Sequence, residues 1–237
     1  MSSDSFFRTG FFTLFSLLTL MRLYYRAKAG LLRERPPLRA EGNLVLATRV
    51  LFGVPLIAAT ICYGLHPQGT WWMEVQLPWS VRMTGLVLGF AALISLWAVH
   101  HALGDNFTTS VLPKAHQTLV QTGPYRWVRH PMYSSYLALF VAAFLVSENV
   151  VIGFTGTAII LSLMTLRLRK EEALLIERFG DRYRRYMKTT RMFFPSLNPR
   201  WYARRAVFIR EAGVPLGELH PQEASLAVHG NTLSDDV

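Results

Sequence analysis

The sequence predicts an all-α integral membrane protein with about five transmembrane helices, a C-terminal helical hairpin and a cytoplasmic amphipathic helix. Of its 237 residues, 51% are hydrophobic and only 17% are charged, whereas soluble domains average about 25% charged residues. Long uncharged stretches recur along the chain, and most of the basic residues behind the net charge of +10 lie between them. This composition argues against a disordered chain and against an ordinary soluble enzyme.

Three apolar stretches in the first half of the chain each have about the 20 residues that one membrane-spanning helix needs. They cover residues 9–25, 44–65 and 81–103. The first stretch also suits a secretory signal peptide, but no small-residue cleavage site precedes Arg26 and Lys28. We therefore expect it to be retained as a span.

A fourth apolar stretch, residues 132–166, is too long to be one span. It has 35 residues and a single charge, Glu148. As one helix it would extend about 52 Å, well beyond a hydrocarbon core of about 30 Å. We expect it to fold back at Ser147-Glu148-Asn149 into a tight hairpin with arms of about 15–17 residues, thin or tilted in the bilayer.

Basic residues fall on alternate sides of the expected spans. The segments 26–43, 104–131 and 167–237 hold 21 of the 25 Lys and Arg residues, whereas residues 66–80 and the hairpin turn hold none. This positive-inside pattern predicts an outer N-terminus and a cytoplasmic C-terminus. It accounts for the basicity without nucleic acid, so we expect the lipid bilayer and no nucleic acid as partner. A bacterial inner membrane and an endoplasmic reticulum both fit.

Beyond the hairpin the chain divides into an amphipathic segment and a tail. Apolar side chains recur at helical spacing from Leu168 to Tyr186, with Gly180 as a point of interruption. Residues 213–237 have no periodic pattern. We expect three regions: N-terminal spans and loops at 1–103, the loop, hairpin and amphipathic helix at 104–195, and a partly disordered tail at 196–237.

Two clusters of polar and aromatic residues flank the hairpin. Residues 117–133 (QTLVQTGPYRWVRHPMY) precede it, and Arg167, Glu171 and Glu172 follow it. Because both arms of a hairpin end at the same membrane face, the clusters are expected to share one pocket. Arg167 and Glu171 lie four residues apart and therefore on one helix face. Such a pocket suits a zwitterionic or cationic small molecule beside an anionic amphiphile.

The same residues also have structural interpretations. Arg167–Glu171 suits a solvated helix pair, His130 a helix cap, and His100-His101 interface residues. The basic residues of these segments suit topology markers and headgroup contacts; they are Lys114, Arg129, Arg169 and Lys170. The single cysteine, Cys62, excludes an internal disulfide, and no Cys/His spacing resembles a metal site, so no metal is expected.

The spacing of several motifs resembles one membrane enzyme family. GPYRWVRHPMY at residues 123–133, EEALLIERFGDRYRRY at residues 171–186, and Pro195 are similar to segments of the isoprenylcysteine carboxyl methyltransferase family. These are integral membrane enzymes that use S-adenosylmethionine. The resemblance covers residues 103–195, whereas the N-terminal spans match only in hydropathy.

The resemblance implies a cofactor, S-adenosylmethionine, and a set of site residues. Arg167 takes the position that contacts substrate, and Arg167 and Glu171 are the expected catalytic pair. The cofactor-contacting positions fall on Gln117, Thr118, Leu119, Val120, Tyr125, His130, Pro131, Met132, Tyr133 and Glu171.

The expected reaction is S-adenosylmethionine-dependent methyl transfer to the carboxylate of a membrane-embedded acceptor, a prenylated cysteine or lipid-like molecule, at a site facing the cytoplasm. Two departures leave the acceptor open, namely Leu112 in place of a glutamine of animal members and Ser135 where a glycine is common. Phospholipid N-methylation, NADPH-dependent reduction of a sterol-type lipid and a non-enzymatic role remain alternatives.

Overall fold

The computed structural model describes residues 3–30, 42–65, 73–107 and 118–196. This part of the chain is helical and contains no β-strand, only isolated bridges. Its α-helices are α1 (Ser3–Lys28), α2 (Asn43–Leu65), α3 (Trp79–Leu103), α4 (Pro131–Ser147), α5 (Val150–Phe179) and α6 (Asp181–Thr189). Two short 3-10 turns are η3 (Gly104–Asn106) and η4 (Gly123–Arg126).

The predicted class, an all-helical integral membrane protein, is confirmed, but the count of five spans is not. By length and composition, α1, α2, α3 and α5 can each cross a membrane, whereas α4 has 17 residues and is shorter. The expected tail at 196–237 lies outside the described residues except for Ser196.

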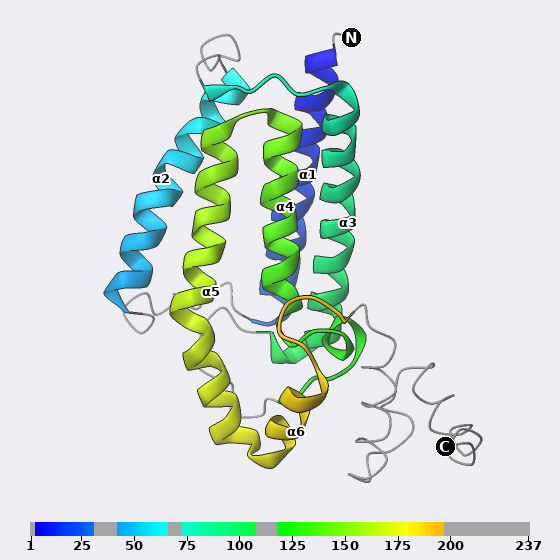
Figure 1. The fold of residues 1–237 in the computed structure, drawn as a ribbon, viewed down its shortest axis with the longest axis vertical. Coiled ribbons are helices and arrows are strands. Elements are labelled where there is room, and N and C mark those ends of the chain that lie inside the picture. Colours follow the sequence, from blue (N-terminus) through cyan, green and yellow to red (C-terminus); the bar gives the residue numbers. More distant parts are fainter. Residues whose placement is uncertain (1–2, 31–41, 66–72, 108–117, 197–237) are drawn as a thin grey trace, which may run out of the picture.

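The five long helices stand side by side with α4 near the centre (Figure 1). Helix α3 packs against α4, α4 against α5 and α5 against α2, while α1 packs against both α3 and α4. The core between them contains Phe7, Phe11, Leu96 and Leu139, none more than 1% exposed. Apolar side chains such as Ile57 instead face outward, which suits contact with lipid.

The chain turns back at residues 147–149, where the hairpin was predicted, and the second arm continues into the amphipathic segment as one helix. Glu148 ends α4 with a left-handed φ of 60°, and Asn149 caps α5 by accepting a hydrogen bond from the Ile152 N–H at 3.1 Å. Helix α5 then runs unbroken for 30 residues through the amphipathic segment. Gly180, with φ +53°, separates it from α6. Because α5 outruns α4, it carries α6 beyond the bundle and back under its end (Figure 1).

Glu148 also belongs to an ion cluster around the buried guanidinium of Arg82, at the end of the bundle away from α6. Arg82 Nη1 lies 2.9 Å from Glu148 Oε2 and 2.8 Å from Asp4 Oδ1, and its guanidinium stacks over the Phe7 ring. Glu148 Oε1 in addition accepts a hydrogen bond from the Leu77 N–H at 2.7 Å. These contacts tie α1, α3 and the hairpin turn together.

Gly153 permits the close approach of α4 and α5. A methyl group added there would lie 2.5 Å from Phe144 Cβ, an atom that side-chain rotation does not move. We expect Gly153→Ala to push the helices apart and to destabilise the detergent-solubilised protein by about 1–3 kcal/mol, seen as a lowered Tm. The matched control is Gly53→Ala in α2, where nothing lies within 4 Å. Since alanine favours helix more than glycine does, equal loss in both variants would contradict this role of Gly153.

Candidate active site

A cavity of about 560 Å³ lies at the end of the bundle where α4 begins. Most of the site residues expected from the sequence line it, namely Thr118, Leu119, Val120, Tyr125, His130, Met132, Tyr133, Arg167 and Glu171. Pro131 is the first residue of α4, between two lining residues, but does not itself line the cavity. Gln117 lies outside the described residues.

Glu171 is held by partners from two helices. Its Oε1 accepts a hydrogen bond from Tyr133 Oη of α4 at 3.0 Å and lies 3.5 Å from Arg167 Nε, one turn back along α5. The side chains of Arg167 and Glu171 are only 13% and 21% exposed. The pair is therefore not the solvated surface pair that the spacing alone suggested. A half-buried carboxylate beside a guanidinium can receive a ligand that carries both a cationic and an anionic group.

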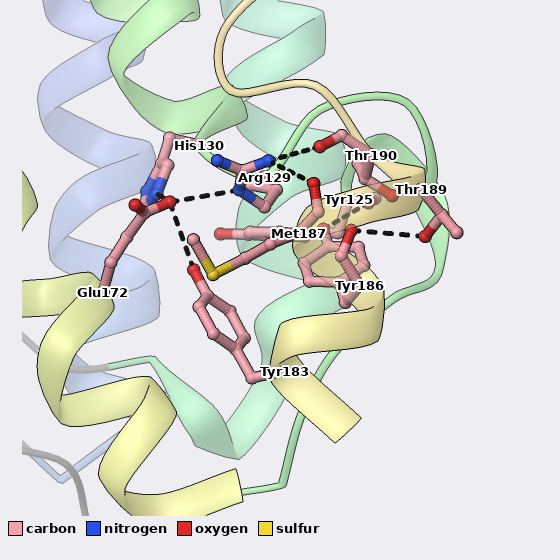
Figure 2. Close-up of polar contacts among 9 residues, drawn as sticks. All are labelled: Tyr125, Arg129, His130, Glu172, Tyr183, Tyr186, Met187, Thr189 and Thr190. Carbon is pink, nitrogen blue, oxygen red and sulfur yellow. Dashed lines mark hydrogen bonds and ion pairs between the residues drawn. The ribbon is translucent and has the colours of Figure 1, made fainter. Parts of the chain in front are cut away.

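Glu172, the next residue, serves a different set of partners (Figure 2). Its Oε1 accepts a hydrogen bond from Arg129 Nε at 3.1 Å and lies 3.2 Å from His130 Nε2. Tyr183 Oη of α6 donates to the same oxygen at 3.5 Å. Glu171 thus faces the cavity, whereas Glu172 fixes the loop before α4 and helix α6 around it.

Arg129 makes buried contacts with α5 and with the end of α6, and is not the topology marker that its position suggested. Its side chain is 9% exposed, and besides Glu172 it donates from Nη1 to the carbonyls of Met187, at 3.0 Å, and Thr190. Figure 2 shows these bonds converging on the guanidinium from α5 and from the end of α6. No spacing in the sequence indicates this role, because two of the acceptors are main-chain carbonyls more than 50 residues away.

The segment that follows α6 is joined to the loop before α4 by main-chain hydrogen bonds. The Arg129 N–H donates to the Arg191 carbonyl at 2.7 Å, and the His130 N–H donates to the Met192 carbonyl at 2.9 Å. Tyr186 Oη of α6 donates to the Tyr125 carbonyl at 2.5 Å. The wall of the cavity around η4 is therefore fixed by residues from the far end of the described chain.

Two tyrosines of this wall stay protonated at neutral pH. Burial raises the pKa of the Tyr125 phenol above its usual range, and the nearby Glu171 raises it further. Burial also raises the pKa of Tyr183, as does its neighbour Glu172. Both phenols therefore act as neutral hydrogen-bonding groups, and neither serves as a base under these conditions.

Several cavity residues were not assigned to the site from the sequence. His100, expected at the membrane interface, is 1% exposed; its Nδ1 lies 2.7 Å from the Leu96 carbonyl oxygen. Arginines of α1 and α2, namely Arg22, Arg26 and Arg49, also line the cavity. Arg26 was counted among the basic residues that mark topology, whereas Arg22 and Arg49 lie within the expected spans and were given no role. Across the described ranges, no group of three His, Cys, Asp or Glu residues is placed to hold a metal ion.

Comparison with known proteins finds a family model that matches the central part of the chain. Residues 83–177 match the model of the isoprenylcysteine carboxyl methyltransferase family. The resemblance predicted from the motifs is therefore confirmed over this region, which contains α4, most of α5 and both Arg167 and Glu171.

Two relatives of the chain are named as methyltransferases. The chain is 33% identical to the methanethiol S-methyltransferase of Pseudomonas deceptionensis, over 54% of this chain and 50% of that protein. It is 27% identical to the protein-S-isoprenylcysteine O-methyltransferase of Homo sapiens, over 51% of this chain and 43% of that protein. It thus spans about half the length of these curated relatives. A solved eukaryotic intramembrane Ras methyltransferase shares 18% identity at a TM-score of 0.46, covering 78% of this chain and 67% of that one.

Proposed function

We propose, on the premise that residues 83–177 belong to the isoprenylcysteine carboxyl methyltransferase family, that the chain is an S-adenosylmethionine-dependent integral membrane methyltransferase. Its acceptor is the carboxylate of an isoprenylcysteine-like amphiphile in the bilayer. One observation carries the proposal: Tyr133, Glu171 and Arg167 are linked at 3.0 and 3.5 Å on the wall of one cavity.

The cavity has the groups that such a cofactor needs. S-adenosylmethionine, when bound, supplies an electrophilic methyl group on a sulfonium and carries an ammonium. Glu171, with Tyr133 fixing its carboxylate, would hold a cationic group. Apolar lining residues such as Leu119, Val120 and Met132 suit the less polar parts of the cofactor.

Arg167 would hold the acceptor. A guanidinium binds a carboxylate through two parallel hydrogen bonds, and so fixes the attacking oxygen in place. The carboxylate is already anionic at neutral pH, with an ordinary pKa near 4, so no general base is required. Orientation and exclusion of water are then the main contributions of the protein. The positive sulfonium and the negative carboxylate neutralise one another as the methyl group is transferred. A water-poor cavity therefore favours the transition state.

The contacts of Glu172 favour a carboxylate acceptor over an amine. A protonated amine has to lose a proton before it attacks, so an amine acceptor would need a base, for which Glu172 and Tyr133 are the candidates. Glu172 Oε1 already faces Arg129, His130 and Tyr183, and Tyr133 donates to Glu171.

We place the site at the cytoplasmic face because 21 of the 25 basic residues flank that side of the spans.

The first test is binding of S-adenosylmethionine to the full detergent-purified chain, by calorimetry. We expect saturable binding that weakens by about 10-fold or more in Glu171→Gln, because a charge-assisted contact worth roughly 1.5–3 kcal/mol is lost. Glu177→Gln removes an exposed carboxylate of the same helix and is the matched control. Folded protein that binds NADPH and not S-adenosylmethionine would instead support the reductase.

A further inference from the structure

The imidazole of His100 is a buried polar group in the cavity wall that the proposed reaction does not use. It stands on the last turn of α3, is 1% exposed, and lines the same cavity as Arg167 and Glu171. Transfer to a carboxylate requires no base, because that group is already anionic at neutral pH. The position of the ring therefore points to contact with a bound molecule and not to proton transfer.

Three contacts hold the imidazole in one orientation. Its Nδ1 lies 2.7 Å from the Leu96 carbonyl oxygen. Because a carbonyl oxygen only accepts hydrogen bonds, Nδ1 carries the proton and donates it. The rings of Tyr25 from α1 and of Phe107, directly after η3, pack against the imidazole with centroids 5.0 and 4.9 Å away. A turn of the ring that exchanged its two nitrogens would break the bond to Leu96.

The second ring nitrogen, Nε2, is left as a hydrogen-bond acceptor. A neutral imidazole has a single N–H, so a proton at Nδ1 means a lone pair at Nε2. In the described part of the chain, Nε2 has no hydrogen-bond partner. A buried acceptor without a partner is costly, and an N–H of a molecule in the cavity would remove that cost.

The surroundings of His100 belong to the side of the cavity where the cofactor is expected. Thr118, a cofactor-contacting position by resemblance, donates from its N–H to Asn106 Oδ1 at 2.8 Å. Asn106 directly precedes Phe107, the ring that packs on His100. Met132, another of the expected cofactor positions, packs against the cluster that contains Phe107. The ring is thus joined by contacts to residues of the proposed cofactor site.

The chemistry of the acceptor atom suits one part of this cofactor. The adenine of S-adenosylmethionine carries an exocyclic amino group, which is an uncharged donor on a flat ring. An uncharged acceptor among aromatic side chains matches such a donor. The ammonium of the same molecule carries a charge and is matched by the Glu171 carboxylate instead.

We propose that His100 is a specificity-determining residue whose Nε2 accepts a hydrogen bond from the exocyclic amino group of the adenine in bound S-adenosylmethionine. The inference rests on the proposed function and deepens it, because it predicts that the site selects adenine over a base with an oxygen at that position. The resemblance to the methyltransferase family assigns His100 no role.

The test compares two ligands by calorimetry on the full detergent-purified chain. S-adenosylhomocysteine, the demethylated form of the cofactor, presents the amino group, whereas S-inosylhomocysteine presents a carbonyl oxygen there. We expect wild type to bind the adenosyl ligand about 10-fold or more tightly than the inosyl ligand, because two acceptors would otherwise face each other.

Two variants of His100 separate hydrogen bonding from packing. His100→Gln supplies both an amide oxygen and an NH2 group, so it should still bind the adenosyl ligand and should bind the inosyl ligand several-fold more tightly than wild type. His100→Met keeps an apolar side chain of comparable size without an equivalent acceptor. It should weaken binding of the adenosyl ligand and bind the two ligands within about 3-fold of each other.

The matched control is His101→Met, which removes the neighbouring histidine of the same helix. His101 is exposed and does not line the cavity, so this variant should keep the wild-type preference. A preference for the adenosyl ligand that persists unchanged in both folded His100 variants overturns the proposal, as does an equal loss of preference in His101→Met.

A further arm separates the cofactor from the acceptor as the source of the N–H. N-acetyl-S-farnesylcysteine has an amide N–H, which S-farnesyl-3-thiopropionate lacks. If His100→Met leaves both nucleoside affinities unchanged but raises KM for the first acceptor alone, Nε2 serves the acceptor and the assignment to adenine is wrong. If folded wild type binds neither nucleoside, the proposed function fails and this inference fails with it. If wild type binds both nucleosides equally, only the role of His100 is overturned.

Discussion

Arg129→Met is expected to unfold the region around the site. The variant would leave Glu172 buried beside His130 and Tyr183 without its guanidinium, and would leave the Met187 and Thr190 carbonyls without their donor. Removing one partner of a buried ion pair costs about 3–5 kcal/mol in other proteins. We expect a lowered Tm in detergent and, because α6 and η4 are no longer fixed together, a loss of S-adenosylmethionine binding in the same preparation.

The control for this variant is an arginine of α6 with an exposed pair. Arg184 Nε lies 3.7 Å from Asp181 Oδ1, with the two side chains 61% and 86% exposed, and such pairs contribute little. Arg184→Met should therefore keep the wild-type Tm. Adding Glu172→Leu to Arg129→Met should recover part of the lost Tm, because the carboxylate left without its arginine is then removed as well. A Tm for Arg129→Met equal to that of Arg184→Met would show that the buried contacts of Arg129 do not stabilise the fold.

The main features that the sequence predicted depend on local pattern. A 35-residue apolar stretch with one charge cannot be a single span, so Glu148 marked the hairpin turn. The four-residue spacing of Arg167 and Glu171 placed both on one face of α5, where the structure shows them. The hairpin in turn brought residues near 130 and near 170 together, which is why most expected site residues line one cavity.

The features that the sequence did not predict depend on contacts between distant segments. Near a membrane, an arginine that marks topology and an arginine that makes buried contacts within the protein occur in the same sequence context, so Arg129 was assigned the wrong role. Glu148 was read only as a polar break, because its partner Arg82 lies on another span.

Arg167 is the position at which substitution should separate chemistry from cofactor binding. We expect Arg167→Gln to lower kcat/KM for an S-prenylated cysteine by about 100-fold or more, because a truncated partner of a buried charge pair typically costs 2–5 kcal/mol. The affinity for S-adenosylmethionine should change little, since Tyr133 still donates to Glu171 at 3.0 Å. The reaction is followed as alkali-labile methyl ester, which also distinguishes it from N-methylation, whose product resists alkali.

Two further variants decide whether the loss comes from the guanidinium itself. Arg169→Gln removes an exposed charge two residues away on the same helix and should leave both quantities unchanged. Arg167→Lys keeps the charge but loses the planar fork that binds a carboxylate bidentately, so its rate should fall between wild type and Arg167→Gln. An equal fall in turnover and in cofactor affinity would mean that Arg167, 3.5 Å from Glu171, orients that carboxylate for the cofactor. The acceptor would then have to be held by another group that lines the cavity.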